Sequence, residues 1–123
     1  MGRYRGLTLR VLARTVPAMG PGKAELIVRI GETGSISAAA RAMGMSYRRA
    51  WQLVEALNQT YKKPVVITAI GGTRGGGATV TAFGKRLVVL FHAMEDKASA
   101  AIAADLRRYT GYLRNGAKRR KHR

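Results

Sequence analysis

The 123 residues are the size of one domain, and 23 Lys and Arg against 6 Asp and Glu give a formal net charge of +17 at pH 7. An excess of this size indicates a polyanionic partner, which is nucleic acid or an anionic membrane surface. The sequence lacks cysteine, which excludes disulfides, thiolate zinc sites and a cysteine nucleophile, and its apolar runs are too short to span a bilayer.

The first third of the chain predicts a strand and then a helix. Residues 6–14 alternate apolar and polar side chains, as a half-buried strand does. Pro17 and the segment 20–22 then interrupt the chain, and Pro21 suits the start of a helix. Gly31 and Gly34 mark its end, so we expect a first helix over about 22–33.

The next segment predicts a short helix and a sharp turn. Ser35 or Ser37 can cap the helix, because a serine hydroxyl accepts a hydrogen bond from an otherwise unpaired amide. Alanines at 38–40 leave room for a neighbouring helix, and Gly44 supplies the positive φ of a turn. Ser46 can cap a third helix that runs to about Thr60. Two short helices joined in this way are typical of a helix-turn-helix.

The third helix has two distinct faces on a helical wheel. Its apolar stripe comprises Ala50, Leu53, Val54, Leu57 and Tyr61, and its polar face comprises Arg48, Gln52, Glu55 and Gln59, with Arg49 at the edge. Arg and Gln make bidentate contacts with guanine and adenine edges in the major groove. We therefore interpret this helix as a recognition helix; solvated surface charge is the alternative. Trp51 lies between the two faces and is expected to be a packing residue or a phosphate-side contact.

Residues 65–81 predict a β-hairpin. A β-branched strand over 65–70 precedes a glycine-rich loop over 71–77, and a second short strand follows over 78–81. After a recognition helix such a hairpin is a wing, and the glycines around Arg74 would let it approach a DNA backbone or a minor groove. A nucleotide-phosphate loop is the rival interpretation, but the Gly-Lys-Ser/Thr ending is missing and a strand follows, not a helix.

The remaining chain predicts one long helix over 82–113, capped by Thr81, and a disordered basic tail over 114–123. A helix of about 30 residues is roughly 45 Å long, whereas the domain should have a radius of gyration of about 14 Å. The helix would extend beyond its own domain. A second copy of the chain is then the simplest partner against which its apolar stripe could pack. A break into two helices near 95–98 is the alternative. The expected dimer interface comprises Leu87, Leu90, Phe91, Met94, Ala98, Ile102, Leu106 and Tyr109.

These elements predict a mainly α-helical fold with a small β-hairpin, a winged helix-turn-helix domain over 6–95 with a C-terminal dimerisation helix. No two acids are placed as a catalytic pair, so we expect no enzymatic activity, no cofactor and no metal site. His92 has no second ligand nearby in the sequence and is interpreted as a packing residue. We expect a cytoplasmic protein, because the N-terminus lacks the pattern of a signal peptide.

Three stretches carry a resemblance to a known family: Gly20-Pro-Gly-Lys-Ala-Glu-Leu, then Glu32-Thr-Gly-Ser-Ile-Ser-Ala-Ala-Ala-Arg-Ala-Met-Gly-Met-Ser-Tyr-Arg-Arg-Ala-Trp, and Thr81-Ala-Phe-Gly-Lys-Arg-Leu after the glycine-rich loop. They resemble the N-terminal domain of ModE-type molybdate-responsive regulators over about residues 6–95. LysR-type regulators share the helix-turn-helix layout and are less similar.

The resemblance implies a winged helix that dimerises through its long C-terminal helix on a palindromic operator. It places Ser46, Tyr47, Arg48, Arg49 and Gln52 at the DNA and the wing on the flanking backbone. The candidate DNA-binding residues are these five with Ser35, Ser37, Thr73, Arg74, Gly75 and Gly76. Full-length members carry C-terminal oxyanion-binding domains, and no such second globular segment is found in this sequence, so whether molybdate or any other effector is sensed stays open.

The resulting hypothesis is a homodimeric transcriptional regulator that binds double-stranded DNA. One alternative is a nucleoid-type protein that coats DNA with little sequence preference, which the charge and the basic tail also suit. Another is an adaptor for a protein or a small ligand whose helix-turn-helix no longer binds DNA.

Overall fold

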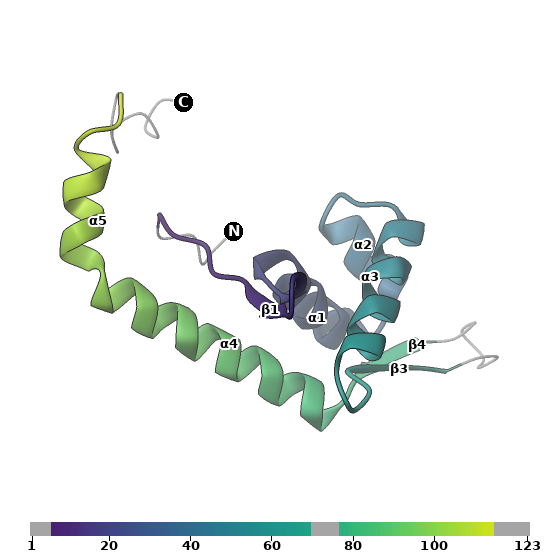
Figure 1. Ribbon diagram of the computed structural model, residues 1–123. Helices are drawn as coiled ribbons and strands as arrows, with labels where there is room; N and C mark the ends of the chain where they lie inside the picture. Colours follow the sequence, from purple (N-terminus) through teal and green to yellow (C-terminus); the bar gives the residue numbers. More distant parts are fainter. Residues whose placement is uncertain (1–5, 70–76, 115–123) are drawn as a thin grey trace.

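The computed structural model describes residues 6–69 and 77–114 and has the form of a helical domain with a long helical arm along one side (Figure 1). The elements are β1 Val11–Ala13, β2 Val16–Met19, α1 Pro21–Thr33, α2 Ile36–Ala42, α3 Tyr47–Thr60, β3 Val66–Ala69, β4 Gly77–Val80, α4 Ala82–Ala101 and α5 Ala103–Thr110. The mainly α-helical winged helix-turn-helix fold is confirmed. The expected loop residues Thr73, Arg74, Gly75 and Gly76 and the tail beyond Arg114 lie outside the described residues.

The N-terminal segment differs from the single strand expected over 6–14. β1 and β2 pair antiparallel as a hairpin, and Arg14 adopts a φ of 62° at its turn. Pro17 does not interrupt the chain, because it lies in β2 opposite Leu12. A two-stranded sheet has only edge strands, and an edge strand tolerates the missing N–H of proline.

The ends of the first three helices follow from local side chains and glycines. Gly34, at a φ of 71°, ends α1 and donates its N–H to the Ile30 carbonyl at 2.8 Å. The Ser35 hydroxyl accepts from the Ala38 amide at 3.0 Å, so Ser35, and not Ser37, caps α2. Gly44 has a φ of 69° in the turn, and the Ser46 hydroxyl caps α3 by accepting from the Arg49 amide at 3.0 Å.

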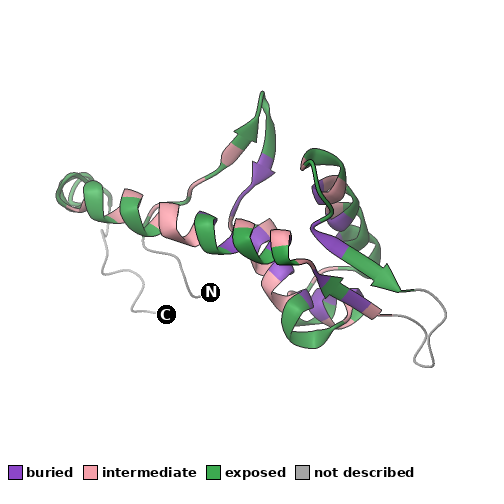
Figure 2. Cartoon of the chain, turned by 90° about the horizontal axis from the view of Figure 1, so that it is seen from below, coloured by how far each residue is buried: buried purple, intermediate pink, exposed green. Residues whose placement is uncertain are grey.

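The core lies where α1, α2 and α3 meet the hairpin of β3 and β4 (Figure 2). Its largest fully buried side chains are Leu26, Ile27, Ile30, Val54, Leu57, Val65 and Val66. Ala39, Ala40 and Ala50 are buried where α2 packs against its neighbours, and their small side chains let the helices approach closely. The apolar stripe expected on α3 is confirmed, since Ala50, Val54 and Leu57 are buried and Leu53 and Tyr61 pack at the margin. The Tyr61 ring meets the Phe83 ring edge-on at 6.2 Å, and burial raises the pKa of the Tyr61 phenol.

The long helix is divided into α4 and α5 at Ile102, and not near 95–98 as the alternative had it. One face of α4 packs against α1 and β4 through Val88 and Phe91. The expectation that Phe91 lies at a dimer interface is corrected, because its side chain is 2% exposed in the core of its own domain. Leu87 and Met94 also pack at the core margin, whereas Leu90 is 59% and Tyr109 is 63% exposed.

The far end of the arm meets the N-terminal segment. A Cβ placed on Gly6 would lie 3.2 Å from Leu106 Cδ2 of α5. The segment before β1 therefore lies close to α5, at the end of the molecule opposite the hairpin of β3 and β4 (Figure 1).

Candidate nucleic-acid interface

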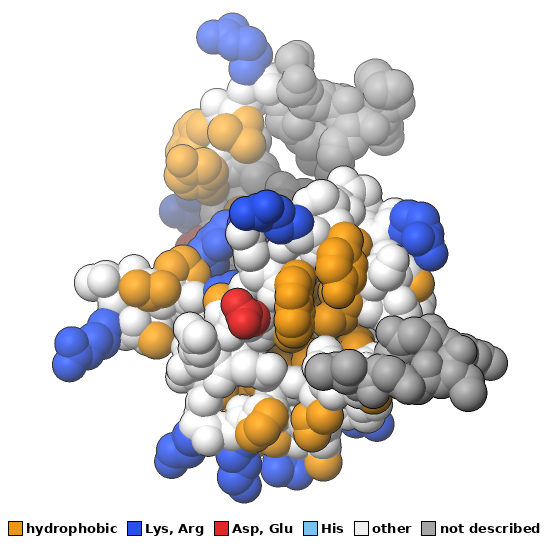
Figure 3. Space-filling model, turned by 90° about the vertical axis from the view of Figure 1, so that its right-hand side faces the viewer, with side chains coloured by type: hydrophobic (Ala, Val, Ile, Leu, Met, Phe, Trp, Pro, Cys, Tyr) orange, Lys and Arg blue, Asp and Glu red, His pale blue; other side chains and the backbone are white. Residues whose placement is uncertain are grey.

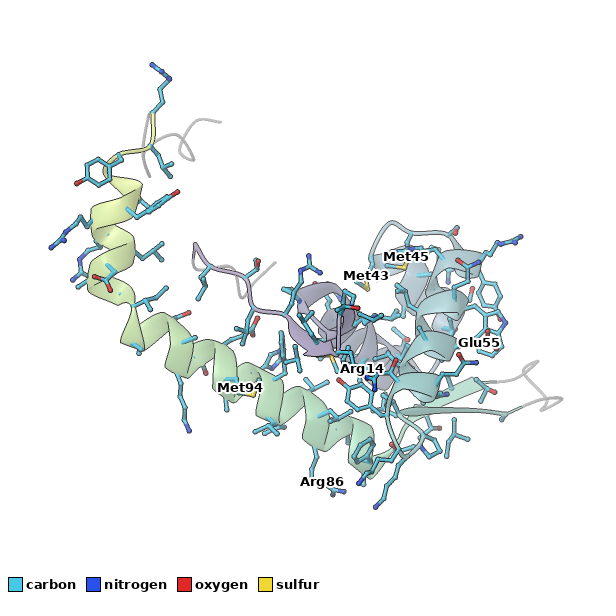
Figure 4. All side chains as sticks on the ribbon, in the orientation of Figure 1. Arg14, Met43, Met45, Glu55, Arg86 and Met94 are labelled. Atoms are coloured by element: carbon cyan, nitrogen blue, oxygen red, sulfur yellow. The ribbon has the colours of Figure 1, made fainter. Side chains whose placement is uncertain are left out.

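The turn between α2 and α3 is held from inside the domain. Met43 and Met45 are partly buried and pack against the core on either side of Gly44 (Figure 4). The Met45 amide also donates to the Ala40 carbonyl at 3.0 Å. Because both flanks of the turn are anchored, the first turn of α3 has a fixed direction relative to α2.

Opposite its buried stripe, α3 presents an exposed polar row made of Arg48, Gln52, Glu55 and Gln59. Arg49 is exposed beside it, and Glu55 projects from the outer side of the helix (Figure 4). Within residues 6–69 and 77–114, neither Arg48 nor Arg49 has an acidic partner. Two guanidinium groups thus lie on the surface in the first turn of the helix with their hydrogen-bonding capacity unused.

The serines of the candidate set differ in their surroundings. Ser35 is half-buried, and both Ser35 and Ser46 use a hydroxyl lone pair to cap a helix. Each hydroxyl can also donate to a further acceptor, since a serine hydroxyl can donate and accept at once. Ser37 is exposed in the first turn of α2.

The hairpin is attached to α3 by Asn58, a residue that the sequence analysis did not single out. Asn58 Oδ1 accepts from the amides of Val65 at 2.7 Å and Val66 at 3.2 Å, and Asn58 Nδ2 donates to the Val66 carbonyl at 2.9 Å. The side chain thus acts as a hydrogen-bonding partner for the start of β3. These three bonds fix the position of the hairpin relative to the exposed row of α3.

The closing end of the hairpin is held in a similar way by Thr81. Its hydroxyl donates to the Pro64 carbonyl at 2.7 Å and accepts from the Gly84 amide at 2.9 Å as the cap of α4. β3 and β4 pair in register from Val66 opposite Val80 to Ala69 opposite Gly77. The base of the hairpin is therefore joined to α3 on one side and to α4 on the other.

Apolar side chains are also exposed on the face that carries the polar row (Figure 3). Tyr47 is 54% and Trp51 is 38% exposed, and neither belongs to the core or to the side chains packed against it. Most of the Trp51 side chain is still covered, so both expectations for it, packing and a phosphate-side contact, stay open.

The described residues offer little for other kinds of chemistry. None of the groups of His, Asp and Glu among residues 6–69 and 77–114 is arranged to hold a metal ion. Within the same ranges, every helix is too short or too polar to cross a bilayer.

The comparison with protein families gives a match over residues 22–85 to the model described as "Bacterial regulatory helix-turn-helix protein, lysR family". The matched segment runs from the start of α1 to the first turn of α4. It includes α2 and α3 of the helix-turn-helix and the hairpin of β3 and β4.

Several relatives are similar over the same part of the chain. The molybdenum-pterin-binding protein MopB of Rhodobacter capsulatus is 48% identical over 85 residues, which is 69% of this chain and 32% of that protein. The DNA-binding transcriptional dual regulator ModE of Escherichia coli is 39% identical over 71 residues, covering 58% of this chain and 27% of ModE. The chain thus spans about a third of the length of these relatives. Among solved structures, ArgP from Mycobacterium tuberculosis aligns with a TM-score of 0.48 at 22% identity, over 69% of this chain and 30% of that one.

Proposed function

Because the chain belongs to the bacterial regulatory helix-turn-helix proteins of the LysR family, we propose that it is a transcriptional regulator that reads double-stranded DNA with α3 in the major groove. The observation that carries this proposal is the exposed position of Arg48 and Gln52 in the first two turns of the helix, opposite its buried apolar stripe. The family is one of regulators, not enzymes. A protein with this role acts at the chromosome, so we place it in the cytoplasm, associated with the nucleoid.

The chemistry of the row fits base reading. A guanidinium can donate two parallel hydrogen bonds to guanine O6 and N7, and a glutamine amide can pair with adenine N6 and N7. Recognition helices meet base edges with the residues of their first turns, where Arg48, Arg49 and Gln52 lie. The hydroxyl hydrogens of Ser35 and Ser46 suit phosphate oxygens, which position the protein without specifying sequence.

We further propose that the glycine-rich segment 71–77 contacts the flanking DNA. Asn58 and Thr81 support this, because Asn58 attaches the start of β3 to α3 and Thr81 attaches the end of β4 to Pro64 just before β3. Arg74 would meet the phosphate backbone or a minor groove, which glycine neighbours allow to approach closely.

The proposed active form is a homodimer on a palindromic site. Outward-facing apolar side chains on α4 and α5 support it, with Leu90 at 59% and Tyr109 at 63% exposure. Leu87, Met94, Ala98, Ile102 and Leu106 are half-buried and would complete the contact from the edges of the arm. Two copies would then present two recognition helices to successive major grooves.

A comparison of two arginine variants tests the proposal. Arg48→Ala should lower affinity for a selected operator by about tenfold or more and reduce the preference over random DNA, as the loss of a bidentate base contact does. Arg74→Ala should weaken binding to both kinds of duplex equally. Electrophoretic retardation at fixed salt measures both. An Arg48→Ala protein with unchanged operator affinity and unchanged preference would contradict the assignment of α3.

The second candidate is a DNA-coating protein, and the charge of +17 together with exposed Arg107, Arg108 and Arg114 on and after α5 favours it. Titration of random and selected duplexes at two salt concentrations separates the candidates, since non-specific binding is almost entirely phosphate electrostatics. A specificity ratio near one indicates coating. Failure to retard any duplex at moderate salt indicates an adaptor.

A further inference from the structure

Two aromatic side chains of α3 lie outside the buried core and reach the surface. Tyr47 and Trp51 are one helical turn apart, at 54% and 38% exposure. Within residues 6–69 and 77–114, neither ring is paired with another ring and neither belongs to the buried core. Large apolar side chains that adjoin one another at the surface, with polar residues around them, are typical of an interaction site.

The helical wheel places both rings on the edge of α3 that faces the hairpin. Trp51 precedes Asn58 by seven residues and Tyr47 by eleven, so each lies within about 20° of the direction of Asn58 at 100° per residue. Asn58 hydrogen-bonds to the first residues of β3. The aromatic pair is therefore on the hairpin side of the polar row, about 10 Å along the axis from Asn58 in the case of Trp51.

The surroundings of the pair point to DNA as its partner. Arg48 precedes Trp51 by three residues and Gln52 follows it directly, and both belong to the exposed row. A partner seated on the rings would thus also meet these base-reading groups. Because Arg48, one turn before Trp51, has no acidic partner in residues 6–69 and 77–114, a partner with negative charge fits this surface.

The only apolar group on the base edges of the major groove is the C5-methyl of thymine. We propose that Trp51, with Tyr47 beside it, packs against thymine methyl groups and is a specificity-determining residue for sites with thymine next to the bases read by Arg48 and Gln52. The proposal rests on DNA binding through α3. It replaces the expected phosphate-side role of Trp51 with a contact that distinguishes sequences.

Replacing thymine by uracil tests this contact, because it removes the methyl group and keeps the Watson–Crick edge. The probe is a duplex selected from a random pool, prepared with thymine and with every thymine replaced by uracil, and then replaced one position at a time. With the wild-type chain, affinity should fall about fourfold for each methyl group in contact, from the transfer free energy of one buried carbon. Trp51→Ala should bind the thymine duplex more weakly and should lose most of the difference between the two duplexes.

Two control variants keep the result interpretable. Trp51→Phe retains an aromatic ring and should keep part of the thymine preference. Leu12→Ala, at an exposed position of β1 away from α3, should keep all of it. Affinity for random duplex DNA should be the same in all four proteins, and circular dichroism reports whether each one is folded.

The outcomes distinguish this contact from DNA binding itself. Equal affinity of the wild-type chain for thymine and uracil duplexes, or a thymine preference that survives in Trp51→Ala, overturns the contact and leaves the function of α3 intact. Failure of the wild-type chain to retard any duplex overturns the proposed function.

Discussion

Ser35 and Ser37 are equivalent candidates in the sequence for the start of α2, and only Ser35 has the extended backbone of a cap, with φ −152° and ψ 129°. Ser35→Ala should therefore lower the free energy of unfolding by about 1 kcal/mol, the usual effect of losing a helix cap. Ser37→Ala, at the exposed position two residues on, should change it by less than about 0.5 kcal/mol. Urea denaturation without DNA measures both. Equal losses in the two variants would contradict the assignment of the cap.

Asn58 is expected to matter more than its polar character suggests. Asn58→Ala removes one acceptor that serves two amides and one donor to a carbonyl, all in a partly buried position. Unsatisfied backbone groups should then lower the free energy of unfolding by about 1–3 kcal/mol. Gln59→Ala, the exposed neighbour, is the matched control and should be nearly neutral. A shift in the urea midpoint no larger than that of the control would show that water replaces the side chain at no cost.

At the scale of residues, the sequence analysis identified those whose effect is local. Ser46, Gly44 and the apolar stripe of α3 could be predicted because caps, positive φ and helical periodicity act within a few residues. Asn58 could not, since its partners are seven and eight residues away across a loop. Phe91 was assigned to a partner chain because periodicity reports that a face is apolar and not what covers it.

At the scale of elements, α4 approaches the hairpin at a glycine. A Cβ on Gly84 would lie 2.6 Å from the Val65 carbonyl oxygen, which itself accepts from the Thr81 amide at 3.0 Å. Gly84→Ala should thus lower the free energy of unfolding by about 1–3 kcal/mol through overpacking, in spite of the higher helix propensity of alanine.

Gly22 in α1 is the matched control for that substitution. Nothing lies within 4 Å of a Cβ placed on it. Gly22→Ala should raise the free energy of unfolding by about 0.4–1 kcal/mol, because the unfolded chain loses conformational freedom. Thermal or urea unfolding of both variants gives the comparison, and the same sign of change in the two would contradict the packing of α4 against Val65.

The bounds of an element could be predicted where its apolar periodicity is strong or where capping residues, glycine or proline mark its ends. The other bounds could not. The bounds of α1, α3, β3 and β4 fall within a residue or two of those expected. The hairpin of β1 and β2 was missed because Pro17 was interpreted as a break, although an edge strand accepts it. The boundary between α4 and α5 at Ile102 could not be predicted, because no proline or glycine stands near it in the sequence.

At the scale of the whole molecule, the arm of α4 and α5 allows the proposed dimer to be tested apart from DNA. Leu90→Glu places a charge on an apolar side chain that is 59% exposed, so the domain should remain folded. Because Leu90 would be buried only at the dimer contact, its loss there should raise the dimer dissociation constant by at least about tenfold. Leu12→Glu, at 55% exposure on β1, should leave it unchanged.

Sedimentation equilibrium over a range of protein concentrations measures both variants. A wild-type chain that stays monomeric throughout that range would contradict the dimer, and a dimer unaffected by Leu90→Glu would place the contact elsewhere on the molecule.

The attachment of the hairpin to α3 through Asn58 also bears on the thermodynamics of association. A wing that had to be ordered on contact would add an unfavourable entropy to binding and slow the formation of the complex. With three hydrogen bonds already made in the free chain, the strands at the base of the hairpin need no such ordering. Asn58→Ala should therefore act mainly on the association rate and on the entropy of binding, with the dissociation rate set by the groups that contact the bases.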